Sequence, residues 1–261
     1  MKILFRKALF VEGFFLMIIS ILTSCSSEKR FNDVTVSIEP ETTYAHHMSS
    51  IGQQFTDVQS NKIVKISNET RNYLQEVINS IRINNELFFK DKKDVELVFI
   101  ESVNPFYYSL PNGKVVMSSG LVKKYIKTEE LFAAILAIEL IRVEKKYYKM
   151  KRLIPNGSIT INDILSFQKL SPEQNERLYE WAYILLRRSG REGIAVLNVL
   201  QIKNKNILDF TLMVDDGRIL TSAERKFKSF LVSHENLGEI SKAHNVQNKK
   251  YSKLLYQMEL Q

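Results

Sequence analysis

The strongest structural signal in the chain lies at residues 128–143, which read Thr-Glu-Glu-Leu-Phe-Ala-Ala-Ile-Leu-Ala-Ile-Glu-Leu-Ile-Arg-Val. This segment predicts a helix that runs to about Tyr148, because Thr128 is a favourable N-cap residue. Glu129 and Glu130 then lie in the first turn, where the helix dipole favours negative charge. Apolar residues surround the helix on nearly every side, so we expect it to be central and covered by other elements.

Glu139 lies in the middle of this apolar segment. An ionised carboxylate in such a place is unfavourable unless it is paired, and Arg142 lies three residues later on the same helix face. The residues alone therefore predict a partly buried ion pair between Glu139 and Arg142.

The sequence before this helix predicts a small sheet. Residues 95–100 are apolar and short, as in a strand, and residues 114–118 have the same character and end near Gly120. Residues 104–113 contain two prolines and a glycine, so we expect a long loop there, close to a cleft. The fold class is therefore α+β, mainly helical with a small β-sheet.

A further helix is predicted upstream of the first strand. Leu74, Val77, Ile78 and Ile81 follow the i, i+3, i+4, i+7 pattern of an amphipathic helix. Ser67 or Asn68 can cap its N-terminus.

The N-terminus has the features of a lipoprotein export signal. Three basic residues precede an apolar run at 14–22, which is too short to span a membrane. The run ends in Leu22-Thr23-Ser24-Cys25, which resembles the bacterial lipobox, and Cys25 is the chain's only cysteine. We expect 1–24 to be a signal peptide and Cys25 to be lipidated; the alternative is cleavage elsewhere with a free thiol.

These patterns divide the chain into four parts: a signal peptide at 1–24, a lipid-anchored tether at 25–65, a domain at 66–235 and a C-terminal tail at 236–261. The tether is predicted from its polar composition, and His46 and His47 within it are interpreted as exposed residues rather than metal ligands. The net charge of +8 is scattered among acidic residues, so nucleic-acid binding is not expected.

Several segments together resemble the zinc metallopeptidase family (gluzincins) of the CAAX prenyl endopeptidases, HtpX and BepA-type proteases. They are Val103-Asn104-Pro105-Phe106, residues 110–116, Ser119-Gly120-Leu121, residues 129–137, Ser171-Pro172-Glu173-Gln174, residues 185–190 and residues 221–225. The resemblance covers roughly residues 67–231 and implies a zincin-like fold. It also implies a zinc site on the helix that contains Glu139.

This chain departs from the family at the metal site. In H-E-x-x-H the histidines bind zinc and the glutamate is the general base; the matching positions here are Ile138, Glu139 and Arg142. Ile138 has no donor atom, and an arginine is not deprotonated in proteins. Counting without gaps places the family's later glutamates at Asn175 and Arg177, whereas a one-residue slip would place Glu176 and Glu180 there. No zinc or other cofactor is therefore expected.

The resemblance implies a pseudopeptidase that binds polypeptide without cutting it, as a chaperone, scaffold or regulator in envelope protein quality control. The predicted binding elements are the strand at 114–118, taken as an edge strand, and its loop: Asn104, Pro111, Gly113, Val115, Val116 and Met117. Expected partners are the membrane, through the lipid anchor, and unfolded envelope polypeptides or an active protease relative. Since Ser26 follows Cys25, we expect the outer membrane, facing the periplasm. The alternatives are an active metalloendopeptidase with a rearranged metal site and a purely structural lipoprotein.

Overall fold

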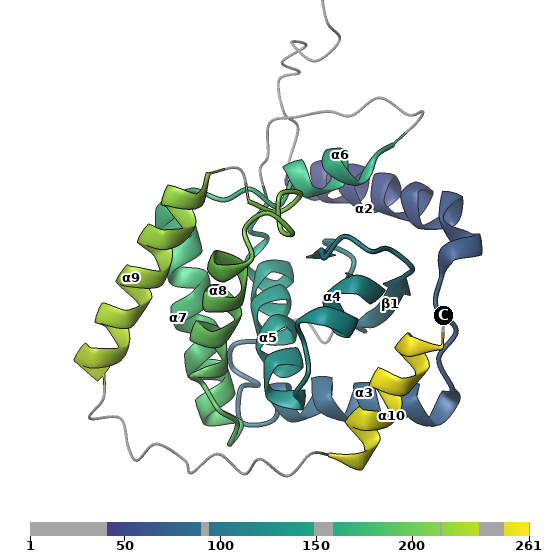
Figure 1. Cartoon of the computed structure of the whole chain (residues 1–261). Helices are drawn as coiled ribbons and strands as arrows, with labels where there is room; N and C mark the ends of the chain where they lie inside the picture. The colour runs from purple at the N-terminus through teal and green to yellow at the C-terminus, as the bar shows by residue number, and fades with distance from the viewer. Residues whose placement is uncertain (1–40, 90–93, 149–158, 215, 235–247, 261) are drawn as a thin grey trace, which may run out of the picture. The chain divides into compact units, whose positions relative to one another are not determined.

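The computed structural model describes residues 41–89, 94–148, 159–214, 216–234 and 248–260, all within one compact unit, Ser37–Gln261 (Figure 1). The predicted signal peptide, 1–24, and Cys25 lie outside the described residues. The unit is α+β, mostly helical with one three-stranded sheet. Its elements are α2 (Glu41–Val58), η2 (Ser60–Lys62), α3 (Asn68–Arg82), β1 (Glu96–Ile100), β2 (Tyr107–Ser109), β3 (Lys114–Ser118), α4 (Ser119–Lys124), α5 (Glu129–Lys145), α6 (Ile161–Ser166), α7 (Pro172–Arg188), α8 (Ala195–Lys205), α9 (Gly217–His234) and α10 (Lys249–Glu259).

Helix α5 is the central element, as its sequence predicts. The side chain of Thr128 caps its N-terminus by accepting a hydrogen bond from the backbone N–H of Leu131, and every residue from Phe132 to Val143 is buried. It packs against α3, α7, α8 and β2, and Figure 1 shows it between α7 and α8 on one side and the sheet on the other. The helix ends at Lys145, because Lys146 takes the left-handed conformation that commonly terminates helices.

Helix α3 also forms where the apolar spacing predicts it. Ser67 is its N-cap and accepts a hydrogen bond from the backbone N–H of Thr70. Its predicted stripe is buried throughout, at Leu74, Val77, Ile78 and Ile81. The predicted i, i+3, i+4, i+7 pattern is therefore confirmed.

The sheet has the strand order β1-β3-β2, in which β1 runs parallel to β3 and β2 runs antiparallel to it. Strand β3 is therefore the central strand, and all five of its residues are buried. The prediction that residues 114–118 form an edge strand is wrong, because a neighbouring strand lies on each side. The second neighbour, β2, forms within residues 104–113, where the sequence predicted only a loop.

The two faces of the sheet are covered by different helices. Val98, Ile100, Tyr108 and Val116 share one apolar cluster with the buried residues of α2 and α6, whereas the alternate residues of the strands pack in the cluster that contains α3 and α5. Figure 1 shows α2 and α6 together at one end of the unit. The face toward α5 is the one that positions the site described below.

Helix α2 contradicts the prediction of a tether over residues 41–65. Tyr44, Met48, Ile51 and Phe55 are buried on one face of this helix, against the sheet. Their spacing of i, i+4, i+7 and i+11 is that of an amphipathic helix, so burial of this face stabilises the segment despite its polar composition. His46 and His47 are consequently helical; His46 is exposed and His47 is half-buried.

Helix α10 contradicts the prediction of a tail over residues 249–259. Tyr251, Leu254 and Met258 are buried, and the helix packs against α3 and α4. The hydroxyl of Tyr251 donates a hydrogen bond to the carbonyl of Ile126 at 2.7 Å. Residues 235–247 lie outside the described part of the chain. None of the helices in the described part is long and apolar enough to cross a membrane.

Candidate functional site

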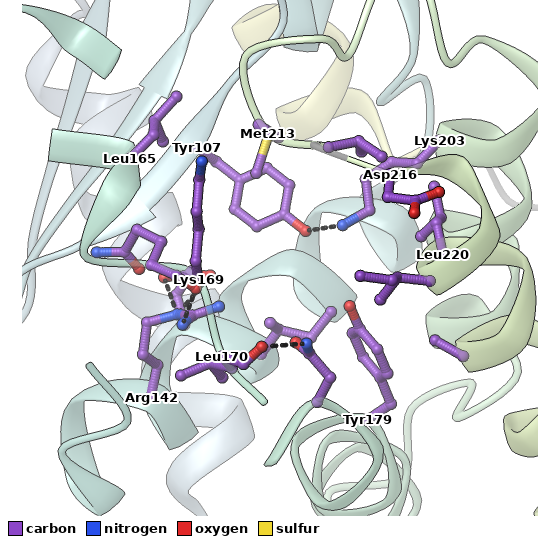
Figure 2. Close-up of a pocket in the computed structure, with 17 residues that line it drawn as sticks. Tyr107, Arg142, Leu165, Lys169, Leu170, Tyr179, Lys203, Met213, Asp216 and Leu220 are labelled. Atoms are coloured by element: carbon purple, nitrogen blue, oxygen red, sulfur yellow. Dashed lines mark hydrogen bonds and ion pairs between the residues drawn. The ribbon is translucent and has the colours of Figure 1, made fainter. Parts of the chain in front are cut away.

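A cavity of about 150 Å³ lies beside the middle of α5. Its walls come from β2, α5, α7, α8, the beginning of α9 and the segments that connect them, and Figure 2 shows the lining side chains. Its polar lining comprises Tyr107, Glu139, Arg142, Gln168, Lys169, Asn175, Tyr179, Lys203 and Asp216. With Leu165 of α6, residues from six separate elements therefore converge on one small space.

Three of the four positions that the resemblance assigns to lost metal ligands line this cavity. They are Ile138, Arg142 and Asn175, and Glu139 lies with them. Arg177, the fourth position, is exposed and does not line it.

Helix α7 presents Asn175 and Tyr179, one turn apart, to the cavity. The alternative pair of ligand positions, Glu176 and Glu180, does not line the cavity. The carboxylate of Glu176 instead forms an ion pair with Lys226 on α9.

The predicted binding residues around β3 do not lie at the cavity. Val115, Val116 and Met117 are fully buried within the central strand, and Asn104 is exposed elsewhere. Pro111 and Gly113 lie in the turn between β2 and β3, where Gly113 has a φ of 93°. The structure therefore places the site on β2 rather than on β3, through Tyr107.

Glu139 and Arg142 form the ion pair that their spacing predicts. The Nε of Arg142 lies 3.2 Å from Oε2 of Glu139, and the two side chains are 8% and 1% exposed. The same Nε donates a hydrogen bond to Oε1 at 3.4 Å. Arg142 also donates from Nη1 to the carbonyls of Tyr147, at 3.2 Å, and Gln168, at 3.0 Å. The guanidinium is thus held in place by one carboxylate and two backbone carbonyls.

The side chains at the family's ligand positions do not fit a zinc ion. Ile138 offers no donor atom, and Arg142 brings a positive charge to the place of the second histidine. Asn175 donates its amide hydrogen to the carbonyl of Leu170 at 3.3 Å. Among the described residues, no three His, Cys, Asp or Glu side chains are grouped as a metal site requires. The absence of zinc from the protein itself stays a prediction.

Sequence reasoning missed Lys203, a buried lysine in this cavity. Lys203 is 7% exposed, and its Nζ donates a hydrogen bond to the hydroxyl of Tyr107 at 3.1 Å. Within the described residues, no carboxylate lies at ion-pair distance from it. A signal was present in the sequence, because Lys203 continues the apolar stripe of Val196 and Leu200 on α8.

Two tyrosine hydroxyls complete the polar lining. Burial raises the pKa of Tyr107, and the carboxylate of Glu139 raises it further. Burial is also the main reason why the pKa of Tyr179 is raised. Both phenols are therefore protonated at neutral pH and can donate hydrogen bonds.

No protein-family model matches the chain, and no curated protein sequence matches it. The resemblance to the zinc metallopeptidases therefore stays a prediction that rests on the motifs and on the chemistry of this cavity.

Proposed function

We propose that the protein is a lipoprotein of the bacterial outer membrane, anchored through Cys25 and facing the periplasm, whose domain is a degenerate, zincin-like metallopeptidase domain. It binds polypeptide segments without cleaving them and acts as a chaperone, scaffold or regulator of envelope proteins. The observation that carries this proposal is the ion pair of Glu139 with Arg142 at the place where a peptidase of this kind holds its metal.

The pairing leaves Glu139 poorly suited to the work of a general base. A base that activates water needs a water molecule beside it and an electrophile that lowers the barrier to attack. Glu139 is 1% exposed and its neighbour is a guanidinium bound to two carbonyls. The arrangement favours a structural role for this carboxylate.

The outer side of β2, the strand at the edge of the sheet, is the proposed pairing position for an extended polypeptide, and its three residues are buried in the structure. Phe106 accepts a backbone hydrogen bond from Ser118, and Leu110 donates one to the carbonyl of Lys114. The alternation of an antiparallel pair therefore directs the backbone groups of Tyr107 and Ser109 to the other side. The carbonyl of Ser109 is already bound by the side chain of Gln168 at 2.9 Å. Tyr107, which lines the cavity, is left as the pairing position, so the bound segment is short.

The decisive experiment measures binding, cleavage and metal content on one sample of the full-length protein. We expect fluorescein-labelled unfolded casein to bind, to remain intact, and zinc to be far below one ion per chain by elemental analysis. A chelator should leave the melting temperature unchanged, because no metal binding is linked to folding. One zinc per chain, together with casein cleavage that Glu139→Gln abolishes, would establish the active metalloendopeptidase instead.

The lipid anchor is tested separately. Cys25→Ala should move the protein from the membrane fraction to the soluble fraction or leave it unprocessed, because a thioether-linked lipid is the only proposed attachment. Ser26→Ala, one residue away, is the matched control and should fractionate like the wild type. Unchanged fractionation of Cys25→Ala, with processing insensitive to globomycin, would remove the anchor from the proposal.

A further inference from the structure

Hydrogen-bond donors from three different elements point into the cavity. Lys203 comes from α8, Tyr107 from β2 and Tyr179 from α7, and Figure 2 shows the ammonium and the two hydroxyls directed toward the same space. Tyr107 accepts from Lys203, so its own proton remains available for another acceptor. The hydroxyl of Tyr179 has no hydrogen-bond partner among the described residues. The cavity is therefore rich in donors.

Among the described residues that line the cavity, the buried cation Lys203 has no counter-ion. Glu139 pairs with buried Arg142 at 3.2 Å, and Asp216, at the exposed rim of the cavity, pairs with the exposed Arg218 at 2.8 Å. Within the described part of the chain, the ammonium of Lys203 contacts the neutral hydroxyl and the ring of Tyr107 and no carboxylate. A buried ammonium without a negative partner is unfavourable, and an anion entering the cavity removes that penalty.

The size of the cavity limits what this anion is. Its volume is about 150 Å³. That volume is below the roughly 300–1,000 Å³ of pockets that enclose whole cofactors or drug-sized ligands. The cavity admits the end of a ligand, such as one terminal residue or one acidic group.

The donor set favours a carboxylate over a phosphate. Of the two lysines that line the cavity, Lys169 is exposed and Lys203 is buried. A single buried ammonium matches a single negative charge, and two hydroxyls suit the two oxygens of a carboxylate. A phosphate carries close to two charges and is typically held by arginine or by several backbone N–H groups. Arg142 is already bound to Glu139 and to the carbonyls of Tyr147 and Gln168.

We propose that the cavity binds the carboxylate of a polypeptide's C-terminal residue, with Lys203 as the counter-ion and Tyr107 and Tyr179 as hydrogen-bond donors. The inference rests on the proposed function, because Tyr107 is also the buried residue of β2 whose backbone groups are directed away from β3. A chain end is the part of a polypeptide that both a short pairing edge and a small cavity accommodate. The side-chain carboxylate of an aspartate shares this chemistry and is the alternative source.

The test compares three fluorescein-labelled pentapeptides on the full-length protein by fluorescence polarisation. One has a neutral sequence with a free C-terminal carboxylate, the second is the same peptide amidated, and the third is amidated with aspartate as its last residue. We expect the free acid to bind at least about tenfold more tightly than the neutral amide, which corresponds to about 1.4 kcal/mol. If the aspartate amide binds like the free acid, the cavity accepts either source of carboxylate; if it binds like the neutral amide, the terminal carboxylate is the ligand.

Variants of the lining residues test whether the tighter binding of the free acid than of the amide depends on this cavity. Lys203→Met should abolish the difference between acid and amide, and Lys203→Arg should retain part of it because the charge remains. Tyr107→Phe and Tyr179→Phe should each weaken the free acid several-fold, without affecting the amide. Lys205→Met is the matched control, because Lys205 is exposed on the same helix. Melting temperatures of all variants show whether each is folded.

Failures of the two proposals are distinguishable. Equal binding of acid and amide, or a preference that persists in Lys203→Met, overturns the carboxylate site while polypeptide binding stands. If unfolded casein binds but none of the pentapeptides does, the carboxylate site is likewise overturned alone. If neither casein nor any pentapeptide binds, both proposals fall.

Discussion

Two clusters of charged side chains lie against α5, a partly buried one at its N-terminus and a buried one at its middle, and they are built differently. In the first, Glu129 accepts hydrogen bonds from the hydroxyl of Tyr73 at 2.6 Å, from Arg191 at 2.9 Å and from Asn248. Glu130 accepts from the same guanidinium at 3.2 Å. Each of these carboxylates has several donors, so this cluster has the contacts of a structural network that joins α3, α5 and α10.

The middle cluster is less completely paired. Oε2 of Glu139 lies near Arg142 but accepts no hydrogen bond, and Lys203 has no carboxylate partner among the described residues. A buried polar group that is left incompletely paired is unfavourable for stability, so its presence calls for a functional explanation. The comparison teaches that buried charge alone does not identify a binding site. In the first cluster the donors are used by Glu129 and Glu130, whereas in the middle cluster the ammonium of Lys203 is left for a ligand.

The largest effect is expected from removing the centre of the first cluster. Arg191→Met leaves Glu129 and Glu130 as neighbouring, partly buried carboxylates, and breaking a buried ion pair by removing one partner typically costs about 3 kcal/mol. Urea denaturation should show this loss in the free energy of unfolding. Arg188→Met, an exposed arginine in the same part of the chain, should be close to the wild type. If Arg191→Met lowers the free energy of unfolding by less than about 1 kcal/mol, the first cluster is not the structural network that this comparison makes it.

Glu139→Gln tests the middle cluster and is expected to be milder. Arg142 loses its counter-ion but keeps its hydrogen bonds to the carbonyls of Tyr147 and Gln168, so we expect a loss of about 2 kcal/mol in the free energy of unfolding. The measurement is again urea denaturation at neutral pH. An unchanged free energy of unfolding would exclude a structural role for this carboxylate.

The pH dependence of stability sharpens the description of the first cluster. Burial by itself would raise the pKa of Glu129, but hydrogen bonds from Tyr73, Arg191 and Asn248 outweigh burial and lower the pKa below its ordinary value. A carboxyl group with a lowered folded pKa contributes stability above its unfolded pKa of about 4.3, and loses this contribution as the pH falls through the folded value. Glu129→Gln should therefore be less stable than the wild type by about 1.5 kcal/mol at pH 7. The gap should narrow below pH of about 4 in denaturation experiments; a constant gap would contradict the lowered pKa.

The smallest change in stability is expected where ligand binding is lost. Lys203→Met replaces an ammonium without a counter-ion by an apolar side chain of similar length, so the free energy of unfolding should change by less than about 1 kcal/mol, toward greater stability. Thermal and urea denaturation both measure this difference. A loss of 2 kcal/mol or more would place Lys203 with Arg191, as a structural residue.

The elements that sequence predicts well are those whose own residues determine their environment. An apolar surface all around α5 requires a central helix, and the regular spacing of Leu74, Val77, Ile78 and Ile81 requires a buried face on α3. The ion pair of Glu139 with Arg142 was predictable for the same reason, because both partners lie on one helix three residues apart.

The order of strands was not predictable in this way. Whether a strand is central or at an edge depends on pairing with distant segments, and the prediction of an edge rested on the resemblance alone. In the structure the Nζ of Lys114 donates to Gln53 of α2 and pairs with Glu96, so this lysine is buried in a central strand. Helix α2, which supplies that partner, was itself interpreted as a tether.

The site was predicted in part. The motif positions on α5 and α7 lead to the cavity through Glu139 and Asn175, but β2 and α8 supply Tyr107 and Lys203 from segments that carry no recognisable motif. Lys203 lies on an apolar stripe of α8, and this pattern predicts that the lysine is buried. It does not predict which residue the lysine contacts. Only the fold brings these residues together.

The packing of α10 determines when the domain can become complete during synthesis. Tyr251 bonds to Ile126, and Gln257 exchanges two hydrogen bonds with Ser67, 190 positions earlier. Contacts between such distant residues form late, because a long loop must close first. Until residues 249–259 have been synthesised, the apolar surface of α3 and α4 that they cover is exposed to solvent. A nascent chain halted before residue 249 would therefore be a target for chaperones and proteases, although α5 and the sheet were already present.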